Sequence, residues 1–168
     1  MGIEVQMDMR QIRDYLNREA QKHLQRTITL LQYVGETVVN DIRTSHISNW
    51  IDRTGNLRSS IGYIIAIDGK PIKLSSFERV FGPEEPRQLG KKNESDGSDG
   101  TTQGKAYARE LASLYPNGIA LIVVAGMEYA SYVEKRDNKT VLAQGEIEAR
   151  RLVDQMIREL NSKTNSEK

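Results

Sequence analysis

Residues 9–42 read MRQIRDYLNREAQKHLQRTITLLQYVGETVVNDI, and this stretch carries the strongest local pattern in the chain. Small and apolar residues recur along it in steps of three and four, at Ile12, Leu16, Ala20, Leu24, Thr27, Leu31, Val34, Val38 and Ile42. That spacing follows one face of an α-helix. The sequence therefore predicts one long amphipathic helix over residues 8–44.

The length of this helix is itself informative. At 1.5 Å per residue it would extend about 55 Å, whereas a globule of this size is roughly 40 Å across. Glycine inside a helix costs about 1 kcal/mol relative to alanine, so we expect the helix to be interrupted or bent near Gly35. A straight helix would instead overhang the body, and its apolar surface would need another subunit to cover it.

Strand patterns follow the long helix. Residues 61–67 alternate apolar side chains as a strand does, and Asp68-Gly69 favours a tight hairpin turn. Residues 70–74 should return antiparallel, with Pro71 placing them near an edge of the sheet. The β-branched run at 119–125 predicts a short strand buried on both faces.

The remaining segments complete a prediction of α+β class in one domain, residues 1–168, as the length allows. Helices are expected at 106–115 and 146–160, so the long N-terminal amphipathic helix and the C-terminal helix would pack on a small, mainly antiparallel sheet. Residues 82–104 contain almost nothing to bury and predict a mobile polar loop. Residues 161–168 predict a disordered tail.

Composition narrows the classes of function. The 24 basic and 23 acidic side chains nearly cancel, so no overall field favours nucleic acid or an anionic membrane. The absence of cysteine excludes disulfides and thiolate chemistry, and it suits a reducing cytoplasm. No secretory signal is visible, and the most apolar run is too short to span a bilayer. We expect a soluble protein with no membrane contact.

No recognisable catalytic constellation is present. His23 and His46 have no ligand neighbours at metal spacing, and the glycine pattern at 100–105 lacks the length and the hydroxyl of a phosphate loop. A flexible linker is the simpler interpretation of that pattern. Three acidic residues in the polar loop do not follow calcium-loop spacing: Glu94, Asp96 and Asp99. We therefore predict no enzyme, and no catalytic, cofactor-binding or metal-binding residues.

Three residues around the turn before the first strand are candidates for contacts with a partner. Trp50 could fill the end of the core or anchor another protein. Arg53 and Arg58 bracket the Thr54-Gly55 turn and could contact phosphates or an acidic neighbour.

Two further stretches carry a resemblance: RTGNLRSSI at 53–61 after the long helix, and EYASYVE at 128–134 after an apolar strand. Together they resemble the tail-completion, or head-tail joining, proteins of long-tailed bacteriophages. Members of that family read threonine-glycine-x-leucine-x-x-serine-isoleucine before a sheet, and later a tyrosine-alanine pair and a valine-glutamate pair. The order of helix, sheet and final helix is also similar.

The resemblance implies a structural assembly protein of the phage neck or tail top. Such a subunit would be monomeric or weakly associated when free, would form a homo-oligomeric ring in the virion, and would join the head connector or head-closure protein to the tail without catalysis. It would be assembled in the bacterial host cytoplasm, with at most weak nonspecific contact to passing DNA. Tyr129, Tyr132 and Glu134 then join Trp50 and the two arginines as contact candidates.

Two alternatives remain open at this stage. One is a small metal-dependent hydrolase or phosphodiesterase, and the other is a non-catalytic regulatory binding module.

Overall fold

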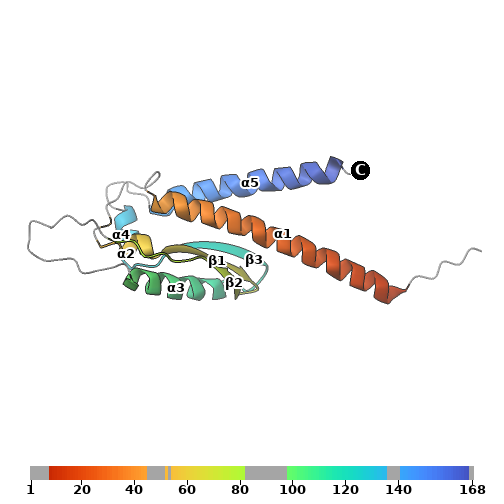
Figure 1. Cartoon of the computed structure of the whole chain (residues 1–168), viewed down its shortest axis with the longest axis horizontal. Helices are drawn as coiled ribbons and strands as arrows, with labels where there is room; N and C mark the ends of the chain where they lie inside the picture. The colour runs from red at the N-terminus through yellow and green to blue at the C-terminus, as the bar shows by residue number, and fades with distance from the viewer. Residues whose placement is uncertain (1–7, 45–51, 53, 82–97, 136–140, 167–168) are drawn as a thin grey trace, which may run out of the picture.

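A computed structural model describes residues 8–44, 52, 54–81, 98–135 and 141–166. The chain is α+β, as the sequence predicted: a long N-terminal helix and a C-terminal helix accompany a small antiparallel sheet (Figure 1). The elements in order are α1 (Met9–Arg43), α2 (Asn56–Ser59), β1 (Ile61–Ile67), β2 (Lys70–Leu74), α3 (Ser98–Ser113), β3 (Ile119–Ala125), α4 (Ala130–Lys135) and α5 (Ala143–Ser166).

The sheet has the order β2-β1-β3, and both pairs are antiparallel. The hairpin forms as predicted: Asp68 and Gly69 both have positive φ, 50° and 76°, as a tight turn requires. Pro71 lies in the edge strand β2, where its missing N–H does not interrupt the hydrogen bonds between strands. The prediction for 119–125 was wrong in one respect, because β3 is the other edge strand and Ile119 is 39% exposed.

Helices cover both faces of the sheet, with α1 and α5 on one side and α3 on the other (Figure 1). Tyr63 and Ile65 of β1 point toward the first side and pack in a cluster with the C-terminal part of α1. Ile64 and Ala66 point the other way and pack against Ala108 and its neighbours on α3. The strict alternation of a strand thus supplies two separate cores.

The predicted interruption at Gly35 is wrong, because α1 is one unbroken helix of 35 residues. A Cβ atom at Gly35 would lie 2.7 Å from the ring of Tyr63. The glycine therefore lets the strand side chain approach the helix backbone, which is a packing role rather than a hinge. Residues 9–27 run past the end of the sheet (Figure 1), and none of them is buried.

Two boundaries also differ from the sequence prediction. The predicted loop 82–104 is too long, because α3 begins at Ser98 and a Cβ at Gly100 would overlap the backbone carbonyl of Asn56. Because α3 packs closely against α2, the polar residues from Ser98 onward are helical. The predicted tail begins too early, because α5 continues to Ser166. Residues 82–97 and 167–168 lie outside the described part of the chain.

Candidate interaction surfaces

The two stretches that carry the resemblance come together at one end of the molecule. The hydroxyl of Tyr129, from the second stretch, lies within hydrogen-bonding reach of the side chain of Thr54, from the first. Just before α4, the N–H of Gly126 donates to the carbonyl of Ser60 at 3.1 Å. Residues more than 65 positions apart in sequence therefore build one surface.

The turn in the first stretch is held by Asp52. Its carboxylate accepts from the N–H of Gly55 at 2.9 Å and from the N–H of Arg58 at 2.7 Å. Gly55 has φ 76°, and a Cβ atom there would overlap the carbonyl of Val80. Backbone conformation and close packing thus require glycine at position 55.

Tyr129 stands at the rim of this surface and is 40% exposed. Partial burial raises the pKa of its phenol, and the carboxylates of Asp52 and Asp99 act in the same direction, while the hydrogen bond to Thr54 opposes them. A neutral phenol that is half exposed suits a hydrogen-bonding contact better than proton transfer near neutral pH. Beside it an open hollow of about 520 Å³ lies between α3 and the segment after β3.

The structure describes some of the predicted contact residues and leaves others outside the described part of the chain. Trp50 and Arg53 lie outside the described residues. Arg58 is half-buried in α2 rather than displayed at the tip of a turn, and Tyr132 is 62% exposed on α4.

Glu134 has a role within its own chain. Its carboxylate accepts from the N–H of Leu142 at 3.0 Å and from the N–H of Ala143 at 2.8 Å. Both groups lie at the start of α5, where helical N–H groups lack partners in the helix itself. The valine-glutamate pair therefore caps the C-terminal helix.

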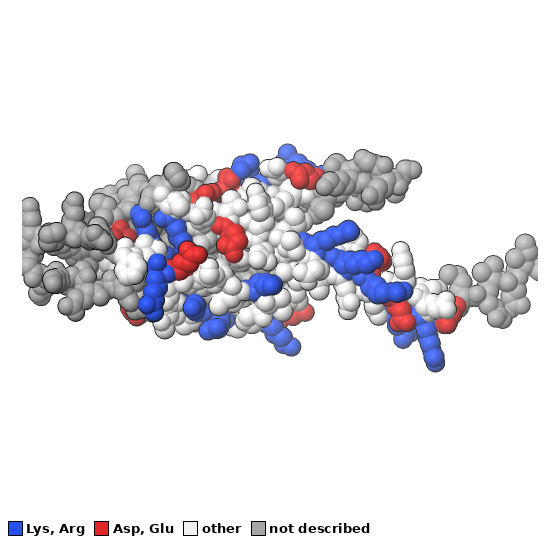
Figure 2. Space-filling view, viewed as in Figure 1, with Lys and Arg blue, Asp and Glu red and all other residues white. Residues whose placement is uncertain are grey.

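A second surface is the segment of α1 at residues 9–27, called here the projecting segment. It exposes large apolar side chains, with Met9 at 67%, Leu16 at 59% and Leu24 at 37%. The segment has five basic side chains and two acidic ones, Asp14 and Glu19, so it carries +3. Figure 2 shows the basic side chains in blue along the projecting helix. Its basic residues are Arg10, Arg13, Arg18, Lys22 and Arg26.

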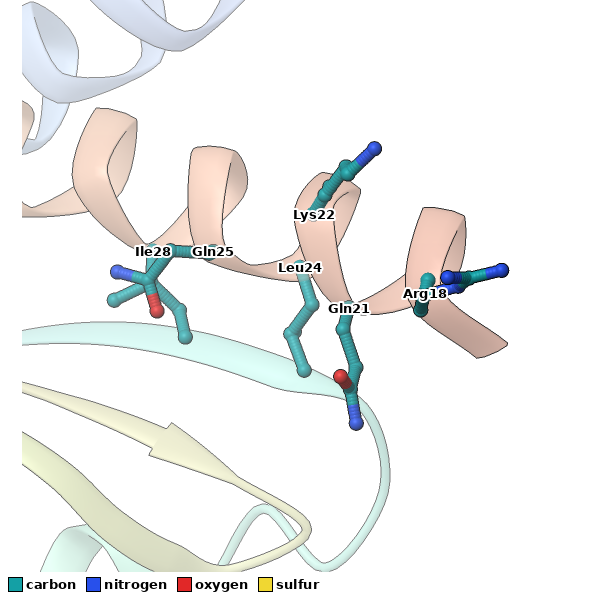
Figure 3. Close-up of a pocket in the computed structure, with 6 residues that line it drawn as sticks. All are labelled: Arg18, Gln21, Lys22, Leu24, Gln25 and Ile28. Atoms are coloured by element: carbon teal, nitrogen blue, oxygen red, sulfur yellow. The ribbon is translucent and has the colours of Figure 1, made fainter. Parts of the chain in front are cut away.

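An open hollow of about 550 Å³ runs along this segment. Leu24 and Gln21 point from the helix toward the end of the sheet, whereas Lys22 points away (Figure 3). Aliphatic and amide groups line this hollow together with the cations Arg18 and Lys22, and such a lining offers a surface for another chain. The periodicity of the sequence predicted that this face of the helix is apolar, but it could not show whether another element packs on it.

Other kinds of site find no support in the part of the chain described. No three His, Asp or Glu side chains gather there as a metal group would. None of its helices is both long and apolar enough to cross a membrane. Comparisons with protein-family models, with curated proteins and with solved structures found no match.

Proposed function

We propose that this chain is a structural subunit of a bacteriophage neck or tail top, which forms a ring and joins the head connector to the tail. The observation that carries the proposal is the projecting segment of α1. It extends a continuous amphipathic helix beyond the core while Leu16 and Leu24 remain exposed.

Helix physics supports a partner for this segment. Isolated helices shorter than about 12–15 residues are marginal in water even when rich in alanine, and most helical stability in proteins comes from packing an apolar face. The projecting segment is 19 residues long and buries none of them. A second chain that covers Leu16 and Leu24 would supply the missing packing.

Charge favours a contact between neighbouring subunits. The projecting segment carries +3 in a chain whose total is +1, so the rest of the chain carries −2. A basic projection on a weakly acidic body favours a head-to-tail arrangement, and contacts of that kind close into rings when the rotation permits. The same charge allows weak contact with passing DNA.

The two stretches that meet at Thr54 and Tyr129 support the proposal through their resemblance to phage joining proteins. Their own chain explains much of each stretch: Gly55 is needed for the turn and Glu134 for capping α5. Tyr129 and Tyr132 remain on the surface, and we assign them to contacts with connector or tail proteins.

Complementation of a phage that lacks the gene tests this function. The double variant Leu16→Asp/Leu24→Asp should fold, since both side chains are exposed, but should yield separate heads and tails in place of complete particles by electron microscopy. Ile72→Asp is the matched control, because Ile72 is an equally exposed apolar residue on β2, at 46%. Complete particles in normal number without the gene product would rule out the neck role.

A further inference from the structure

We propose that the outer edge of β3 is a self-association surface, at which a second copy of the chain adds its own β3 antiparallel. The two copies then share one continuous sheet of the order β2-β1-β3-β3-β1-β2. This inference concerns the isolated chain and does not depend on the proposed role in the phage.

The backbone of β3 offers a row of hydrogen-bonding groups at this edge. The N–H of Asp68 donates to the carbonyl of Gly118 at 2.9 Å, and the N–H of Gly126 donates to the carbonyl of Ser60. Positions 118 and 126 therefore face β1, and alternation turns the polar groups of the odd-numbered residues outward. These are Ile119, Leu121, Val123 and Ala125.

Nothing in the described residues pairs with this row. The sheet ends at β3, and no hydrogen bond to the outward groups is found within the described ranges. Unpaired backbone groups along an apolar strand are a template for another strand, and natural proteins cover or disrupt them.

The opposite edge of the same sheet is disrupted in this way. Strand β2 exposes Lys70, Pro71 and Lys73, and its pairing with β1 shifts register between Ile65 and Ala66. Charge, proline and irregular pairing all discourage strand addition. Strand β3 has none of these protections, because its sequence IALIVVA contains neither proline nor charge.

The side chains of β3 identify the chemistry of the added strand. Leu121 and Val123 on the α1 side are only half-buried, and so is Ile122 on the α3 side. An added strand must therefore present apolar side chains on both faces. Only β1 and β3 do so among the described strands, and β1 is already paired on both sides. We therefore assign the place to β3 of a second copy.

One register satisfies every outward group. When Ile122 lies opposite Ile122 of the second copy, Leu121 meets its Val123 and Ile119 meets its Ala125. All seven residues of the strand then have partners, and the two copies are related by a two-fold axis through Ile122.

Strand addition should stop at two copies. The outermost strands of the combined sheet are both β2, whose exposed lysines and proline prevent further addition. The inference thus gives a dimer for the free chain, where the sequence led us to expect a monomer or weak association.

A single engineered cysteine tests the register. The chain has no cysteine, so Ile122→Cys can form a disulfide only between copies. Residues opposite one another at a non-hydrogen-bonded position have Cα atoms about 4.5 Å apart, within disulfide range. We expect a covalent dimer on a non-reducing gel under mild oxidation.

Ala120→Cys is the matched control for this cross-link. In the proposed register Ala120 lies opposite Val124 of the second copy. Ala120 of the second copy is four residues farther along that strand, about 14 Å away. It should stay monomeric on the gel. Equal cross-linking of both variants, or none for Ile122→Cys, would overturn the register.

Sedimentation equilibrium tests the edge itself. The wild-type chain should have twice its mass of 19.0 kDa. Val123→Pro removes one outward N–H from each copy and should weaken the dimer by about tenfold to a hundredfold, whereas Val123→Thr should keep it. Circular dichroism verifies that both variants fold.

Two outcomes would overturn the assignment. The first is a wild-type chain that stays monomeric at millimolar concentration, which would leave this edge to a different protein. The second is a dimer that survives Val123→Pro but is lost in Leu16→Asp/Leu24→Asp, which would move self-association to the projecting segment. Neither outcome bears on the particle counts that test the neck role, so the two proposals fail separately.

Discussion

The two parts of α1 have similar sequence patterns and opposite environments. Residues 28–43 bury Ile28, Val34, Val38, Val39 and Ile42 against the sheet and α5, whereas residues 9–27 bury nothing. Apolar side chains recur in steps of three and four through both. Periodicity therefore reports which face of a helix is apolar, and a second element decides whether that face is covered.

Close contacts distinguish the covered part. Gly35 admits the ring of Tyr63, and Gly145 on α5 admits the side chain of Ile42, since a Cβ at Gly145 would lie 2.6 Å from its Cδ1 atom. The projecting segment contains no glycine, and none of its residues is buried by the described part of the chain. The covered part of α1 therefore packs closely within the chain, whereas the large side chains of the projecting segment remain available for contact with another chain.

Amide hydrogen exchange of the free protein should show the largest contrast between the two parts. Amides around 34–42 should exchange only through global unfolding, whereas those around 12–24 should exchange through local fraying. With an ordinary stability of at least 5 kcal/mol, the difference in protection should exceed about a thousandfold. Equal protection in a monomer would contradict the exposure of the projecting segment.

Side-chain truncation should give the next largest effect. Ile42 is 2% exposed, so Ile42→Ala should reduce the free energy of unfolding by about 2–5 kcal/mol. Leu16→Ala removes a side chain that is 59% exposed and should change it by no more than about 0.5 kcal/mol. Urea denaturation at low protein concentration measures the free energy of unfolding of both variants. A loss of several kcal/mol for Leu16→Ala would show that the segment packs in the free protein.

Gly35→Ala asks whether the glycine serves packing or bending. Alanine gains about 1 kcal/mol in helix propensity, but its Cβ would collide with the Tyr63 ring, and overpacking costs about 1–3 kcal/mol. We expect a net loss of roughly 1 kcal/mol. The same substitution in a Tyr63→Leu background should be neutral or stabilising. A gain in the wild-type background would mean that the ring does not need this space.

Local patterns predicted the parts of the fold that local forces determine. The long helix and the Asp68-Gly69 hairpin were found because each depends on residues next to one another in sequence. The start of α3 was missed because its glycines and polar residues are typical of a loop. Gly100 and Gly104 instead allow α3 to approach the backbone at Asn56 and Ser60, a tertiary contact that no local pattern shows.

The candidate surfaces were predictable to a smaller extent. The motif residues were located, yet Glu134 was chosen as a contact and instead caps α5, because its partners at 142 and 143 are close only in the fold. The run at 119–125 reads as buried because both its faces are apolar. Its edge is open because the sheet ends there, which depends on strand order and not on composition.

Removal of a tyrosine hydroxyl should give the smallest difference in the free energy of unfolding between the covered part of α1, which Tyr63 contacts, and the projecting segment. The hydroxyl of Tyr63 donates to the carboxylate of Glu36 at 2.7 Å, across the β1–α1 contact. Tyr63→Phe should cost about 1 kcal/mol at neutral pH. Tyr15→Phe is the control, because Tyr15 is 58% exposed in the projecting segment, and it should leave the free energy of unfolding unchanged.

Alkaline pH separates the Tyr63 hydrogen bond from simple packing. Burial raises the pKa of the Tyr63 phenol, and the hydrogen bond to Glu36 and the charge of Glu36 act in the same direction. The unfolded chain loses this proton near pH 10, while the folded chain keeps it, so above about pH 10 stability falls by at most about 1.4 kcal/mol per pH unit from this group. Tyr63→Phe has no phenol there to ionise, and its stability should fall less steeply than that of the wild type over the same range. Parallel curves for the two proteins would mean that Tyr63 ionises as easily in the folded chain as in the unfolded one, and the contact that fixes α1 to β1 would then rest on the ring and Gly35 alone.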